Sequence, residues 1–218
     1  MRTIPLLAAL TITLLAGPAF AHSGHEGHPP AASDASAQIP AAAGTRDPRV
    51  YFTDADLTNQ DGRKLRFYSD VLKGRTVVLN VGYTNCNDAC PLITKQLLQV
   101  REELGDVFGK QVSFVTITSD PARDTPRALK AFAQKQGADV AGWTFLTGRK
   151  DDIDRILKRL GAWSENVEEH ATVLYVMDVD ARRMRRMLPN LPPRAIAEAA
   201  RIVATGKPSE NVPVPGAH

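Results

Sequence analysis

The sequence of 218 residues is poor in several features that mark particular classes of protein. It has only two cysteines, Cys86 and Cys90, which excludes a scaffold stapled by several disulfides. Aromatic residues make up 6%, too few for a surface that stacks the bases of single-stranded nucleic acid. The net charge is only +3, so the composition indicates no nucleic-acid partner. The remainder, 43% hydrophobic and 23% charged, is typical of a soluble globular protein, and the length predicts one domain with extensions.

Residues 1–21 predict a secretory signal peptide. Arg2 precedes an apolar stretch, and Ala19-Phe20-Ala21 forms a small-x-small cleavage site. The alternative is an uncleaved membrane anchor, because the apolar stretch of about 17 residues is at the short limit for crossing a bilayer. In both cases we expect the domain to be exported to the periplasm, either free or tethered to the membrane.

Residues 22–48 predict a disordered tether. It opens with a histidine-rich tract, whose members are His22, His25 and His28. This tract suits weak binding of a transition metal, or is simply the polar start of a linker. The Ala-, Ser- and Pro-rich stretch that follows cannot bury enough apolar surface to fold. We therefore expect one compact domain over residues 49–206 and a loop-like tail over 207–218.

Strand patterns and helix patterns alternate within that domain. Near-continuous β-branched and apolar runs predict buried strands, and apolar residues at helical spacing predict helices. The expected strands cover 76–81, 112–118, 143–146 and 172–177, and the expected helices cover 91–104, 126–137, 151–160 and 193–204. Asp61-Gly62 marks a hairpin turn, and Asn190 is the expected cap of the last helix. The alternation predicts an α/β fold, a three-layer α/β/α sandwich with a mixed central sheet and the strand–cysteine–helix order of thioredoxin-like folds.

The two cysteines directly follow the first expected buried strand, at the start of a helix. Their i, i+4 spacing places both side chains on one face of a first helical turn, where they can form a disulfide or hold one ion. A helix N-terminus lowers the pKa of a thiol, and Cys86, in the loop, should be more exposed than Cys90. Pro91 suits an early helical position. A static disulfide is the alternative, but so short a loop constrains the unfolded chain very little, so we expect a functional pair.

The number of available ligands bears on which metal the pair could hold. Two thiolates suit Cu(I) or zinc, but two cysteines cannot form a closed zinc site of three or four thiolates. Cu(I) accepts three ligands. His170 is the only histidine in residues 49–206 and stands just before an expected strand, in a loop that lies beside the cysteine turn in thioredoxin-like folds. It is a candidate third ligand, with a structural or exposed histidine as the alternative.

Five segments of the domain carry a specific combination of motifs. They are LTNQDG (57–62), VLNVGYTNCNDACP (78–91), VTITSDPARDTP (115–126), WTFLTG (143–148) and EHATVLYVMD (169–178). This combination resembles the Sco/SenC family, thioredoxin-like copper proteins that assemble the CuA centre of cytochrome c oxidase. The resemblance implies that Cys86, Cys90 and His170 bind copper, as Cu(I) or Cu(II).

The match has departures beside these residues. The family commonly has His before the first cysteine and Pro after it, where this chain has Asn85 and Asn87, and many members have Asp in place of Glu169. These neighbours bear on the thiol pKa values, the redox poise and the copper affinity.

The segment SDPARDTP (119–126) also has an interpretation from its residues alone. It follows an expected strand at its carboxyl end, where open α/β sheets place their sites. Asp124 or Thr125 can cap the next helix. Asp120 and Arg123 either order the loop near the cysteines or form an ordinary ion pair of a capped turn.

Two functions compete. The resemblance implies a metallochaperone that delivers copper to the CuA site of apo cytochrome c oxidase subunit II, with other periplasmic copper chaperones or thioredoxin-like reductants as further partners. The alternative is a thiol–disulfide oxidoreductase that keeps target cysteines reduced, in which Cys86 attacks, Cys90 resolves the mixed disulfide, and no histidine is needed.

A peroxiredoxin-type peroxidase is disfavoured, because Tyr83 and Leu79 stand where those enzymes carry Thr and Pro. A passive copper store would lack a protein acceptor.

Overall fold

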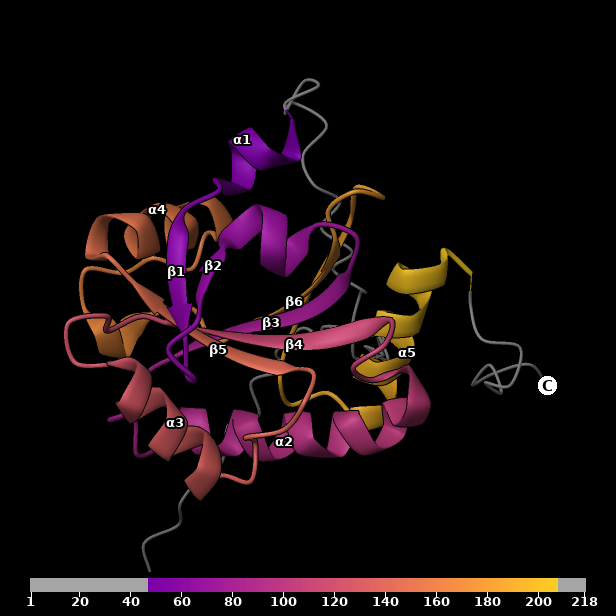
Figure 1. Ribbon diagram of the computed structural model, residues 1–218. Coiled ribbons are helices and arrows are strands. Elements are labelled where there is room, and N and C mark those ends of the chain that lie inside the picture. The colour runs from indigo at the N-terminus through magenta and orange to yellow at the C-terminus, as the bar shows by residue number, and fades with distance from the viewer. Residues whose placement is uncertain (1–46, 208–218) are drawn as a thin grey trace, which may run out of the picture. The chain divides into compact units, whose positions relative to one another are not determined.

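The computed structural model describes residues 47–207 (Figure 1). The predicted signal peptide, the histidine-rich tract and nearly all of the predicted tether and tail lie outside these residues, so they stay predictions. Within residues 47–207, no helix is both long enough and apolar enough to cross a membrane.

A seven-stranded sheet forms the middle layer, in the order β2-β1-β5-β4-β3-β6-β7. Its strands are β1 (Asp56–Asn59), β2 (Lys64–Arg66), β3 (Thr76–Gly82), β4 (Val112–Thr118), β5 (Trp143–Gly148), β6 (Leu174–Asp178) and β7 (Arg183–Met187). β3, β4 and β5 run parallel, and the other neighbouring pairs are antiparallel, so the sheet is mixed as expected. All seven residues of β3 are buried, because β4 and β6 flank it and helices cover both of its faces.

Helices form the two outer layers (Figure 1). They are α1 (Pro48–Phe52), α2 (Ala89–Leu104), α3 (Pro126–Lys135), α4 (Lys150–Leu160) and α5 (Pro193–Thr205), with a π-helix η1 (Phe67–Leu72) and 3-10 turns η2 (Gly105–Val107) and η3 (Val167–Glu169). α2, α3 and α5 pack on one face of the sheet, whereas η1 and α4 pack on the other. The predicted three-layer sandwich is therefore confirmed.

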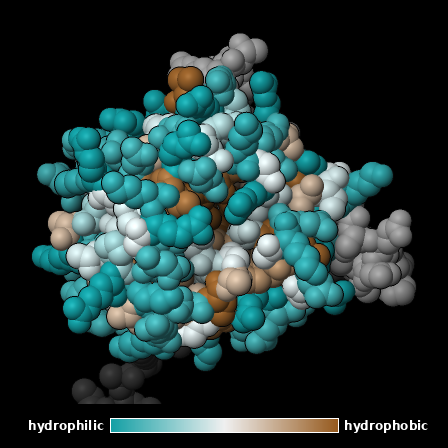
Figure 2. Space-filling model, viewed as in Figure 1, coloured by the Kyte–Doolittle hydropathy of each residue, from teal (hydrophilic) through white to brown (hydrophobic). Residues whose placement is uncertain are grey.

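The pleat of the sheet divides the core into two clusters. Val77, Leu79 and Val81 of β3 pack with η1 and α4, and Val78 packs with α2, α3 and α5, because successive strand residues point to opposite faces. On the face shown in Figure 2, hydrophilic residues cover most of the surface, and the apolar residues in view lie mainly near the centre, with a separate apolar spot at the top, where α1 lies.

The expected strands and helices are all present, with ends shifted by a few residues. One prediction about a helix end is wrong: Asn190 does not cap α5, whose N-cap is Pro192 and has no side-chain hydrogen bond. Two consecutive prolines occupy this end, so fewer backbone N–H groups need an acceptor there. The sequence did not predict β7, since RMRRM lacks an apolar run. The prediction of a hairpin turn is confirmed, because Asp61-Gly62 lies between β1 and β2.

Candidate functional site

The cysteine pair lies where β3 passes into α2, at the carboxyl end of the parallel strands. β3 ends at Gly82, Cys86 lies in the connecting loop, and Cys90 is the second residue of α2. Pro91 follows in the first turn of the helix, where its missing N–H leaves no hydrogen bond unmade. The predicted position of the pair at a helix N-terminus is confirmed, and this edge of an open α/β sheet is where such folds place their sites.

The sulfur of Cys86 accepts a backbone hydrogen bond at the start of α2, as a capping side chain would. The N-cap residue, Asp88, makes no side-chain capping bond, and the backbone N–H of Cys90 instead donates to Cys86 Sγ at 3.2 Å. Both thiols are free and hydrogen-bonded to each other. Both are also buried, Cys86 at 8% and Cys90 at 4% exposure, so the expected difference in exposure is small. The two sulfurs therefore form one unit in the reduced protein.

The surroundings shift the pKa values of the two thiols in opposite directions. Burial alone would raise the pKa of Cys86, but hydrogen bonds from the Cys90 thiol, from the N–H groups of Cys90 and Asp88 and from the Tyr83 hydroxyl lower it overall. Burial, together with the hydrogen bond to Cys86, raises the pKa of Cys90 to about 12. Cys86 is thus the thiol that ionises first, and Cys90 keeps its proton until a partner displaces it.

His170 contacts the ring of Tyr83, and the hydroxyl of Tyr83 in turn donates to Cys86. The imidazole is buried, lies between η3 and β6, and meets the Tyr83 ring edge-on with centroids 5.9 Å apart. Burial lowers the pKa of His170, so the ring is neutral near pH 7, and neutral imidazole is the form that binds metals. Burial and the charge of Cys86 also raise the pKa of Tyr83 to about 12, so its hydroxyl stays a donor.

The structure thus brings Cys86 and Cys90 into contact and places His170 one aromatic ring away. Among residues 47–207, no group of three His, Cys, Asp or Glu side chains is arranged to hold a metal ion. The predicted set of three ligands therefore stays a prediction.

Asp124 lies near the site, and the sequence suggested for it only the role of a possible helix cap. It is 1% exposed and accepts hydrogen bonds from the hydroxyls of Thr84 and Thr118, both at 2.5 Å, and from the Thr84 N–H at 3.1 Å. Thr125, not Asp124, caps α3, through a bond from the Ala128 N–H. The only signal in the sequence was the position of Asp124 in the loop after a buried strand.

The other residues of that loop play a smaller part. Arg123 pairs with Asp120 at 3.1 Å, and the arginine side chain is 76% exposed. Asp120 is buried, but solvent screens the exposed guanidinium, so the pair contributes modestly to stability. It is an ion pair within the capped turn, which was one of the two interpretations of these residues.

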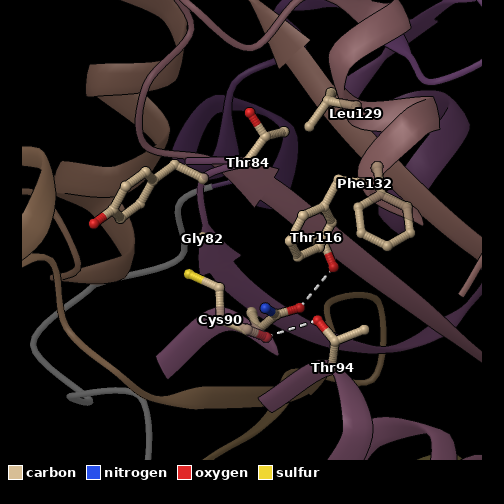
Figure 3. Close-up of a pocket in the computed structure, with 10 residues that line it drawn as sticks. Gly82, Thr84, Cys90, Thr94, Thr116, Leu129 and Phe132 are labelled. Atoms are coloured by element: carbon tan, nitrogen blue, oxygen red, sulfur yellow. Dashed lines mark hydrogen bonds between the residues drawn. The ribbon is translucent and has the colours of Figure 1, made fainter. Parts of the chain in front are cut away.

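A small pocket opens on the side of Cys90 that faces β3 (Figure 3). The Cys90 sulfur points toward Gly82, and a Cβ atom added to Gly82 would lie 3.3 Å from it. The Thr94 hydroxyl donates to the Cys90 carbonyl, and the Thr116 hydroxyl donates to Asn80, each at 2.8 Å. The absence of a side chain at Gly82 therefore gives the second thiol its room.

Comparison with known proteins gives consistent matches. The family model described as SCO1/SenC matches residues 44–205. A protein of Stutzerimonas stutzeri, provisionally named a copper-binding protein, is 37% identical over 95 residues, which are 44% of this chain and only 45% of that relative.

Two solved structures resemble this one. A SCO1/SenC family lipoprotein from Bacillus anthracis is 30% identical with a TM-score of 0.60, and the match covers 69% of this chain and 92% of that chain. BsSco, described with a disulfide switch and as a member of the Sco family of cytochrome c oxidase assembly proteins, is 26% identical with a TM-score of 0.60, over 70% of this chain and 92% of that chain. These likenesses confirm the expected thioredoxin-like fold.

Proposed function

This chain belongs to the SCO1/SenC family, and from that premise we propose that it is a metallochaperone that delivers copper to the CuA site of cytochrome c oxidase subunit II. Copper is its cargo, held by Cys86, Cys90 and His170. The observation that carries this proposal is the contact between two thiols of unequal acidity, with a neutral imidazole one ring away. Thiolate and imidazole are the donors that suit Cu(I).

The geometry suggests an order for loading and release. Cys86 binds first, because its thiol loses a proton most easily. Cys90 then exchanges its proton for the metal, and His170, which contacts the Tyr83 ring, joins as the third ligand. Acceptor thiolates replace these ligands one at a time. An exported domain, tethered or free, suits this role, with periplasmic copper chaperones or thioredoxin-like reductants supplying copper and electrons.

The second candidate is a thiol–disulfide oxidoreductase, which the low pKa of Cys86 favours. The Cys86 thiolate attacks an acceptor disulfide, forms a mixed disulfide and releases one acceptor thiolate. Cys90 then gives up its proton and attacks the Cys86 sulfur, which releases the second acceptor thiolate. The chain ends as a disulfide and the acceptor gains two electrons. The description of BsSco with a disulfide switch is consistent with such chemistry in a relative.

A transfer experiment separates the two roles, because only copper delivery requires His170. The full chain, with His22, His25 and His28 changed to alanine, is reduced, loaded with one Cu(I) and mixed with the reduced apo CuA domain of subunit II. After transfer of two Cu(I) ions per acceptor, ferricyanide removes one electron from the dicopper site, and the resulting CuA absorption is compared for wild type and His170→Ala, with Glu165→Gln as the control at an exposed residue of the same loop.

We expect wild type and Glu165→Gln to form CuA and His170→Ala to fail. Equal transfer by His170→Ala would overturn the chaperone proposal. The same proteins without copper are then mixed with the oxidised acceptor. Loss of the acceptor disulfide, equal in wild type and His170→Ala, would support the oxidoreductase.

A further inference from the structure

We infer that Asp124 is a positioning residue, which clamps the loop that carries Cys86 and thereby holds the two sulfurs together for their chemistry. The inference deepens the proposed function and rests on it for the roles of Cys86 and Cys90. Its evidence is the contact geometry around one buried carboxylate.

The burial of Asp124 is costly and is not compensated by a cation. A carboxylate taken out of water is stable only where other groups replace its hydration. Among residues 47–207, no lysine or arginine pairs with Asp124, since Arg123 pairs with Asp120 instead. Hydroxyl and N–H donors from Thr84 and Thr118 take the place of water. The donors to this buried carboxylate thus come from two separate places, the loop after β3 and the last residue of β4.

Those donors join the two loops that follow β3 and β4. Thr84 stands two residues before Cys86, and Thr118 is the last residue of β4. A further bond, from the Ser119 N–H to the Gly82 carbonyl at 2.9 Å, joins the same two segments at the strand ends. Beyond Gly82, the Asp124 carboxylate is the link that reaches into the cysteine loop.

Within the loop, the remaining bonds around Cys86 are local. The Cys86 N–H donates to the Tyr83 carbonyl at 3.3 Å, and Cys86 Sγ accepts from Cys90 at 3.2 Å. With the clamp removed, the loop keeps these bonds but loses its anchor on β4. The Cys86 sulfur then samples more positions, and the effective concentration of one thiol at the other falls. Disulfide formation and two-sulfur copper binding both weaken for that reason.

The test is the equilibrium of the full chain with glutathione, in which the dithiol and one oxidised glutathione give the Cys86–Cys90 disulfide and two reduced glutathiones. Asp124→Asn removes the charge and one acceptor. We expect it to lower this equilibrium constant about tenfold, the size expected for a hydrogen bond to a charged group. Thr84→Val keeps the shape and changes no charge, and we expect it to lower the constant about threefold.

Rescue and coupling separate a clamp from general destabilisation. Thr84→Ser restores the hydroxyl and should return the constant to the wild-type value. The double variant Asp124→Asn with Thr84→Val should lose no more than Asp124→Asn alone, because both changes break one interaction. Two controls should leave the constant within about twofold: Asp120→Asn, which breaks the nearby ion pair, and Val203→Ala, which weakens the core under α5.

Additive losses, or a loss with Val203→Ala as large as with Asp124→Asn, would overturn the inference. Should Asp124→Asn not fold, the Thr84→Val and Thr84→Ser pair still decides. This exchange contains no copper, so it reads the clamp separately from the transfer experiment, and either can fail while the other holds.

Discussion

The segment with the cysteines (83–90) and the segment with the histidine (166–171) meet at one edge of the sheet, yet hydrogen bonds hold them unequally. The cysteine segment is tied to a distant part of the chain, because Thr84 donates to Asp124 on the loop after β4. The hydrogen bonds of the histidine segment join its residues to one another or to residues two positions away along the chain. Ala171, at the end of the histidine segment, also packs against the core.

This difference suggests a division of labour within the site. The two sulfurs are assembled before any partner arrives, and they suffice for reactions that exchange electrons between thiols and disulfides. Copper binding by three ligands also needs His170, which lies on the more weakly tied segment. Changes to the cysteine segment should therefore affect both kinds of chemistry, and changes to the histidine segment only one.

The largest effect is expected from removing either sulfur. We expect Cys86→Ala or Cys90→Ala to abolish the internal disulfide. Either change should also weaken Cu(I) binding by more than about a hundredfold, because a site with few ligands loses a large share of its binding free energy with each one. Competition with a chromophoric Cu(I) chelator measures the affinity, and thiol counting measures the disulfide. Lys95→Ala, at an exposed residue of α2, should change neither. Tight binding that survives in both cysteine variants would place the copper elsewhere.

Removing the imidazole should split the two reactions. We expect His170→Ala to weaken copper binding about 10- to 100-fold, comparable to the loss of a supporting group at a metal site. Its disulfide equilibrium with glutathione should stay at the wild-type value, because the sulfurs keep their contacts. Both quantities are measured on the same preparation, beside the control Glu165→Gln. A disulfide equilibrium that falls as far as the copper affinity would mean that the two segments act as one.

The pH dependence of copper binding should belong to the sulfurs. Protons compete with copper for thiolates, so the affinity rises with pH. Between the lowered pKa of Cys86 and the pKa of Cys90, about 12, one proton leaves per copper and the affinity rises about tenfold per pH unit. Below the pKa of Cys86 two protons leave, and the slope doubles. His170, whose pKa burial lowers, adds nothing above neutral pH, so His170→Ala should keep the slope there. A changed slope would assign a proton to the imidazole.

Much of the scaffold follows from local patterns in the sequence. β3 is buried on both faces, as its near-continuous run of β-branched and apolar residues indicated. The apolar residues of α4 recur at helical spacing and all face the core. β7 escapes this reasoning because an edge strand needs few apolar residues and gains from charges that block further pairing.

The candidate site is predictable to a similar depth. The spacing of Cys86 and Cys90 at a strand–helix junction indicated their contact, and the topology placed the loop of His170 beside them. Two contributions were out of reach. A tyrosine after a buried strand looks the same in sequence whether or not it contacts a thiol, and a carboxylate in a turn gives no sign that it is buried, as Asp124 is.

The smallest effect concerns Tyr83, the residue through which the two segments meet. Tyr83→Phe keeps the edge-on contact with His170 but removes the hydroxyl that donates to Cys86. The pKa of Cys86 should rise, and its alkylation near pH 7 should slow by about tenfold or less, since a hydrogen bond to a charged group is worth that much only where water cannot replace it.

Tyr175→Phe is the matched control for this change, because Tyr175 is a buried tyrosine of β6 whose hydroxyl lies beside Arg186 and is not among the groups that donate to Cys86, so its loss should leave Cys86 unaffected. The decisive comparison is the effect of His170→Ala on copper affinity in the Tyr83→Phe background. If the ring alone joins the segments, that effect stays as large as in wild type. If it shrinks, the hydroxyl is part of the connection, and the histidine segment is less independent of the sulfurs than its hydrogen bonds indicate.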